Sequence, residues 1–138
     1  MLPLGRFRSG EFAWSNARKA FFDGFHASLA AYADAGNDLI LEHILDTEGW
    51  LDDLQRRLAG HEVFFVAVHC PLEVLIQREH QRGDRPTGSA ARDIETIHVG
   101  KVYDLELNSS NGLDANIQSL LAAWRNPGGP RSGFRNST

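Results

Sequence analysis

The stretch VFFVAVHCPLEVLIQREHQRGDR, residues 63–85, sets the expectation for the fold. Its first six residues form a continuous β-branched and aromatic run, which is typical of a strand that a parallel sheet buries on both faces. Pro71 suits the first position of a helix, and Gly83 suits the position after its end. The stretch therefore predicts a buried strand over 63–68 and a helix from 71 to 83.

The flanking segments repeat this alternation of helix and strand. Apolar residues at three- and four-residue spacing predict helices over 11–35, 47–60 and 113–124, and a short helix is expected over 89–98. Apolar runs predict strands over 39–45 and 102–107. Helices between strands imply right-handed crossovers, so we expect an α/β domain with a parallel sheet. This domain should span residues 1–125, followed by a disordered Pro- and Gly-rich tail over 126–138.

Composition narrows the class of protein. The chain has 138 residues, of which 42% are hydrophobic and 23% charged, as in one ordinary globular domain. A formal net charge of -4 argues against a nucleic-acid-binding surface, and no apolar stretch approaches the ~18 residues of a membrane span. The single cysteine, Cys70, excludes an internal disulfide. We therefore expect a cytoplasmic protein with small phosphorylated ligands.

Three arginines, Arg78, Arg82 and Arg85, follow one another at positions i, i+4 and i+7. On a helix they would spread over about 60° of the surface, so one face would carry three guanidinium groups. Such a group of arginines can neutralise the charge that builds up while a phosphoryl group moves. The alternative is a solvated helix face, with Glu79 and Asp84 as ion-pair partners.

Polar residues also follow the predicted strands. Glu42 and His43 end the first strand, Cys70 follows the second, and Asn108 follows the third. Ligands of α/β proteins gather at this carboxyl edge of the sheet. Glu42 could serve a metal ion or could be a buried carboxylate with a basic partner. His43 and His98 fit structural hydrogen bonding better than acid–base catalysis.

Five motifs occur in a characteristic order: LILEH (39–43), VAVHC (66–70), REHQRGDRPTGSA (78–90), HV (98–99) and YDLEL (103–107). Over residues 11–124 this order resembles the chloramphenicol phosphotransferase family of P-loop kinases. The arginine-rich motif is the most specific part of the resemblance. The family resemblance implies a three-layer, adenylate-kinase-like α/β fold with a parallel sheet.

The resemblance also implies an activity and its residues. Such enzymes use ATP to phosphorylate a hydroxyl group of a small molecule, which the sequence does not identify. Arg78, Arg82 and Arg85 would be catalytic lid arginines, and Arg82 and Arg85 would bind the nucleotide together with Asn108. Glu42 would hold Mg²⁺ through water.

One part of the family pattern is missing. No Gly-x-x-x-x-Gly-Lys-Ser/Thr motif occurs in the 138 residues. By resemblance, this phosphate-binding loop and a catalytic aspartate precede the part seen here. We therefore expect a domain without its P-loop strand, which is inactive alone; the alternative is a non-catalytic nucleotide-binding or pseudokinase fragment. The missing strand would lie between those at 39–45 and 63–68, so their open edges could aggregate or pair with a second copy of the chain.

Overall fold

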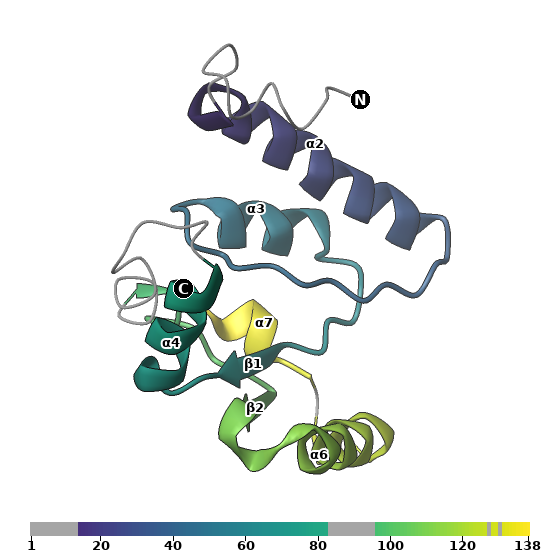
Figure 1. Cartoon of the computed structure of the whole chain (residues 1–138). Coiled ribbons are helices and arrows are strands. Elements are labelled where there is room, and N and C mark those ends of the chain that lie inside the picture. The colour runs from purple at the N-terminus through teal and green to yellow at the C-terminus, as the bar shows by residue number, and fades with distance from the viewer. Residues whose placement is uncertain (1–13, 83–95, 127, 130) are drawn as a thin grey trace. The chain divides into compact units, whose positions relative to one another are not determined.

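The computed structural model describes residues 14–82, 96–126, 128–129 and 131–138 (Figure 1). The chain divides into two compact units, Met1–Leu41 and Glu42–Thr138. Among the described residues, none of the helices is long and apolar enough to cross a membrane.

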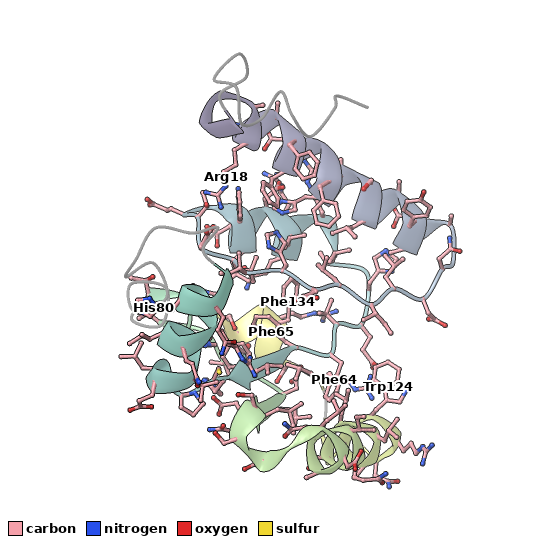
Figure 2. The ribbon with its side chains drawn as sticks, viewed as in Figure 1. Arg18, Phe64, Phe65, His80, Trp124 and Phe134 are labelled. Atoms are coloured by element: carbon pink, nitrogen blue, oxygen red, sulfur yellow. The ribbon has the colours of Figure 1, made fainter. Side chains whose placement is uncertain are left out.

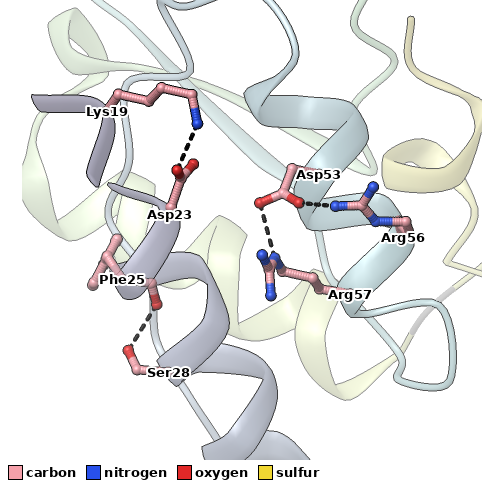
Figure 3. A network of polar contacts seen from close by, with 7 residues as sticks. All are labelled: Lys19, Asp23, Phe25, Ser28, Asp53, Arg56 and Arg57. Atoms are coloured by element: carbon pink, nitrogen blue, oxygen red, sulfur yellow. Dashed lines mark hydrogen bonds and ion pairs between the residues drawn. The ribbon is translucent and has the colours of Figure 1, made fainter. Parts of the chain in front are cut away.

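The first unit contains helix α2 (Trp14–Asp34), as the apolar spacing predicts. Phe21 lies in edge contact with Phe22 and stacks on Phe25, at ring distances of 5.2 and 6.3 Å. Lys19 forms an ion pair with Asp23 one turn later, at 2.6 Å (Figure 3). The helix is followed by Gly36, whose φ of +87° suits a residue without a side chain.

The second unit begins with an irregular segment, which is followed by helix α3 (Trp50–Arg57). Trp50, Leu51 and Leu54 share the buried face of this helix. In the same helix, Asp53 accepts hydrogen bonds from the guanidinium groups of Arg56 and Arg57 (Figure 3). The predicted helix over 47–60 is confirmed with shorter bounds.

Within the described part of the second unit, the sheet consists of β1 (Val66–His69) and β2 (Leu105–Asn108), and helix α4 (Leu72–Arg82) follows β1. The strands are parallel, with Val66 paired to Leu105 and His69 paired to Asn108. Both are shorter than predicted at their amino ends. The mixed helix and strand architecture, with a small parallel sheet, is compatible with an α/β kinase-like fold.

The predicted strand over 39–45 is wrong. The segment is irregular, and Ile40 within it is fully exposed. A strand needs a neighbouring strand to pair its backbone groups, and the described residues contain none beside this segment. Most of the helix expected over 89–98 lies outside the described residues. The description resumes at Thr96, which has helical backbone, and a turn follows it over 97–100.

Beyond β2, the chain forms a short 3-10 turn, η1 (Ser109–Asn111), and the predicted helix α6 (Leu113–Arg125). The expectation of a disordered tail is wrong for residues 131–138. There the chain forms helix α7 (Gly133–Asn136), and Phe134 is buried against the ring of Phe65 at 5.5 Å (Figure 2). The side-chain amide of Gln55 donates hydrogen bonds to the carbonyls of Phe134 and Ser137, at 2.6 and 2.9 Å.

Arg131 and Asp104 explain why this segment is ordered. The guanidinium of Arg131 lies 4.6 Å from the ring centre of Phe64 and 4.1 Å from that of Trp124. Asp104 accepts hydrogen bonds from the backbone N–H groups of Phe65 and Gly133, at 2.8 and 2.9 Å. These partners are far apart in the sequence. The Pro- and Gly-rich composition of the segment therefore predicts disorder, although long-range contacts order it.

Candidate functional site

The last residues of the two strands, His69 and Asn108, are direct neighbours in the sheet. In a parallel pair, residues in register lie on the same face, and side chains alternate along each strand. Ala67, His69, Glu106 and Asn108 therefore share one face. The polar side chains of this face collect toward the carboxyl ends of the strands, where α/β proteins bind ligands.

His69 belongs to a cluster of four titratable side chains. Its Nε2 atom lies 2.9 Å from Oε1 of Glu106, and its ring centre lies 4.4 Å from that of His98. Nδ1 of His98 in turn lies 2.7 Å from the hydroxyl of Tyr103. The loop that carries His98, the segment before β2 and both strands thus contribute to one polar network. We call these four residues, His69, His98, Tyr103 and Glu106, the histidine cluster.

Burial shifts the pKa values of two members of this cluster. Burial lowers the pKa of His98, the neighbouring His69 and Lys101 lower it further, and Glu106 acts in the opposite direction. Burial, with a smaller contribution from Glu106, raises the pKa of Tyr103. Tyr103 therefore keeps its hydroxyl proton at neutral pH. A neutral His98 ring can accept a hydrogen bond from this hydroxyl.

The lowered pKa of His98 predicts a stability that depends on pH. The folded state binds fewer protons than the unfolded state below the ordinary histidine value of 6.5. The free energy of unfolding should therefore fall as the pH drops through this value, and should level off below the lowered folded-state pKa. Because the ring is partly exposed, we expect a loss below about 1 kcal/mol.

Urea unfolding between pH 5 and 8 would measure this loss. In His98→Gln, the free energy of unfolding should depend less on pH over this range. Equal slopes for both proteins would show that His98 has the same pKa in the folded and unfolded states.

Of the three predicted arginines, the structure describes the side chain of Arg78 alone. Arg78 lies exposed on α4, and Arg82 is the last residue of that helix. The side chain of Arg82 and the whole of Arg85 lie outside the described residues. The shared face of the three arginines therefore stays a prediction.

Glu42 is exposed in the irregular segment. It therefore neither ends a strand nor is a buried carboxylate. Within the described ranges, no group of three or more His, Cys, Asp or Glu side chains could enclose a metal ion. Mg²⁺ commonly uses only one or two carboxylates, together with waters and substrate phosphates. A single exposed carboxylate fits that mode of binding.

Asn108 and His43 make local contacts. Oδ1 of Asn108 accepts a hydrogen bond from the backbone N–H of Ser110 at 2.9 Å, which caps η1. Its carbonyl accepts from the side chain of Asn116 at 2.8 Å. The His43 ring lies 5.2 Å from that of Trp50. Asn108 thus shapes the loop after β2 and lies at the ligand edge.

Comparison with known proteins places the chain in a family. The sequence model of the family described as "Chloramphenicol phosphotransferase-like protein" matches residues 4–123. The chain belongs to this family. The match includes the arginine motif, both strands and every member of the histidine cluster.

Two curated relatives come from Mycobacterium tuberculosis, one from strain CDC 1551 / Oshkosh and one from strain ATCC 25618 / H37Rv. Both are named "Putative O-phosphotransferase". Each is 29% identical to the chain over 127 residues, which cover 79% of the chain and 56% of the relative. The chain thus spans little more than half the length of these relatives. No solved structure matches it.

The sequence analysis missed three members of the histidine cluster, His69, Tyr103 and Glu106. All three lie inside quoted motifs, VAVHC and YDLEL, where His69 ends an apolar run and Glu106 interrupts another. That interruption was the available signal for these two residues. The pairing of His69 with Glu106 follows from the register of β1 against β2, which neither motif contains.

Proposed function

We propose that this chain forms part of an ATP-dependent O-phosphotransferase, which transfers the γ-phosphate of ATP to a hydroxyl group of a small molecule. The family match over residues 4–123 carries this proposal. The name of the mycobacterial relatives and the polar edge of the parallel sheet support it. We expect the reaction to take place in the cytoplasm.

Each expected site residue has a role in this proposal. Arg78, Arg82 and Arg85 neutralise the phosphate charge that builds up during transfer. The loop that Asn108 caps contacts the nucleotide. Glu42 holds Mg²⁺ through water, and the bound ion offsets the charge of the phosphates.

A non-catalytic nucleotide-binding role is the second candidate. The 138 residues themselves contain no Gly-x-x-x-x-Gly-Lys-Ser/Thr motif. The backbone N–H groups and lysine of that motif hold the phosphates of the nucleotide in P-loop enzymes.

A transfer assay tests the proposal. The 138-residue chain, incubated with γ-labelled ATP, Mg²⁺ and a panel of small alcohols that includes chloramphenicol, should give no labelled product, because the phosphate cradle is absent. A fusion that places a strand, a Gly-x-x-x-x-Gly-Lys-Ser/Thr loop and a helix before Met1 should give product. The matched control is the same fusion with alanine in place of the loop lysine.

The outcomes separate the two candidates. A fusion that binds ATP but labels no acceptor would favour the non-catalytic role. Labelled product from the 138-residue chain itself would show that transfer needs no such loop.

A further inference from the structure

A cavity of about 260 Å³ lies at the amino ends of the two strands. Phe64 and Asp104, which come shortly before β1 and β2, form one part of its wall. Ala123 and Asn126, at the end of α6, form another. The candidate site lies at the carboxyl ends of the same strands. The cavity is therefore at the opposite edge of the sheet.

Arg131 contributes a buried and incompletely paired guanidinium to the wall of this cavity. Its side chain is only 8% exposed. Nη1 donates to the Glu62 carboxylate at 3.0 Å and Nη2 to the Trp124 carbonyl at 2.7 Å, whereas the buried Nε–H has no acceptor among the described residues. Such a group is costly, because it has given up its hydrogen bond to water. The cavity therefore favours a ligand that brings an acceptor to Arg131.

Aromatic rings surround the same guanidinium. The rings of Phe64 and Trp124 lie 5.6 Å apart, and Arg131 packs over both (Figure 2). Phe64 also lines the cavity, so a flat ligand can pack against its ring. The volume of about 260 Å³ is just below the ~300 Å³ at which pockets for drug-sized ligands begin. This space suits a single ring with a small polar substituent.

The charges around the cavity argue against an anionic ligand. Glu62 already pairs with Arg131, Asp104 lines the cavity, and α6 ends there with the negative end of its dipole. The two oxygens of Asp104 each accept one backbone N–H, from Phe65 and from Gly133, and a carboxylate oxygen can accept a second hydrogen bond. The cavity therefore offers an acceptor to a ligand that carries an N–H group.

We propose that this cavity binds an uncharged aromatic carboxamide, a ligand with the chemistry of nicotinamide. A small shift of the Arg131 guanidinium turns Nε–H toward the cavity, where the carbonyl oxygen of the ligand accepts its hydrogen bond. The amide N–H of the ligand donates to Asp104, and the ring packs on Phe64. The site is separate from the proposed phosphoryl transfer, and its test needs no activity.

An occupied cavity would also stabilise the segment over 131–138. Arg131 belongs to this segment, and Asp104 holds it through the backbone N–H of Gly133. A ligand that binds the folded arrangement alone shifts the equilibrium toward it. Saturating nicotinamide should therefore slow tryptic cleavage after Arg135.

Nuclear magnetic resonance of the 138-residue chain tests the site. The Nε–H signal of Arg131, assigned with Arg131→Lys, should shift saturably with nicotinamide in the millimolar range expected of so small a ligand. The backbone N–H signals of Gly128 and Gly129, which also line the cavity, should shift with it. The absence of any saturable shift in these three signals would overturn the site.

Nicotinate is the matched ligand, because it has the same ring with a carboxylate in place of the carboxamide. It should bind about tenfold more weakly than nicotinamide or worse, since its charge meets Asp104. Equal or tighter binding of nicotinate would overturn the proposal of an uncharged ligand.

Two neighbouring alanines of α6 give a matched pair of variants. Ala123 lines the cavity, whereas Ala122 is exposed outside it. Ala123→Leu fills the cavity without removing a polar group, so it should weaken nicotinamide binding by more than about tenfold. Ala122→Leu should change the affinity by less than about twofold. Unchanged affinity in Ala123→Leu would show that nicotinamide binds elsewhere and would refute the proposal.

Discussion

Replacing Arg85 by alanine in the fusion is expected to lower the turnover number by about 10³-fold, and its affinity for ATP far less. The same result is expected for Arg82→Ala. The reason is that charge on the transferred phosphoryl group is greatest in the transition state. A guanidinium that meets this charge acts on kcat more than on binding.

Measuring kcat by product formation and the Kd for ATP by calorimetry separates the two effects. Arg125→Ala is the matched control, because Arg125 is an exposed arginine at the end of α6. Small and equal losses in kcat and ATP affinity would assign Arg82 and Arg85 to a solvated surface. Arg78→Ala extends the series to the arginine that the structure describes as exposed on α4.

Replacing Gly133 by alanine is expected to lower the stability of the second unit by about 3 kcal/mol, the upper range for forcing an atom into filled space. A Cβ atom at this position would lie 2.6 Å from the carbonyl oxygen of Val102 and 2.9 Å from the backbone nitrogen of Asp104. Both are backbone atoms, which cannot rotate away. The substitution would also disturb the hydrogen bond from Gly133 to the Asp104 carboxylate.

Urea unfolding followed by circular dichroism would measure this loss. Gly129→Ala is the control, since a Cβ there would meet no atom within 4 Å and the residue does not have a positive φ. Limited proteolysis should cut after Arg131 or Arg135 more readily in Gly133→Ala than in the control. Equal stability of the two variants would mean that residues 131–138 do not pack as described.

Helices were the part of this fold that could be predicted from the sequence. The apolar spacing of α2, α3, α4 and α6 follows from the 3.6-residue period, which is local to each segment. Their ends shifted by a few residues because capping depends on backbone geometry, as at Gly49, whose φ is +83°. The family resemblance, which rests on short motifs, was predicted as well and is confirmed by the match over residues 4–123.

Strands were predicted less well, because a strand is completed by its neighbour. The apolar run at 63–68 and the alternating apolar segment at 102–107 correspond to β1 and β2, which pair with each other. The equally apolar segment at 39–45 has no partner strand among the described residues and stays irregular. The arginine motif was visible in the sequence, but its arrangement in space remains a prediction.

The sequence by itself determined helices α2, α3, α4 and α6, the parallel crossover from β1 to β2 and the family. The tertiary structure decided what depends on residues far apart in the chain. Arg131 is ordered by Phe64 and Trp124, and Phe134 by Phe65, although their local sequence resembles a linker. His69 meets Glu106, 37 positions later, only because the register of two parallel strands sets them on one face. Local periodicity carries no information on register, since backbone hydrogen bonds between strands fix it.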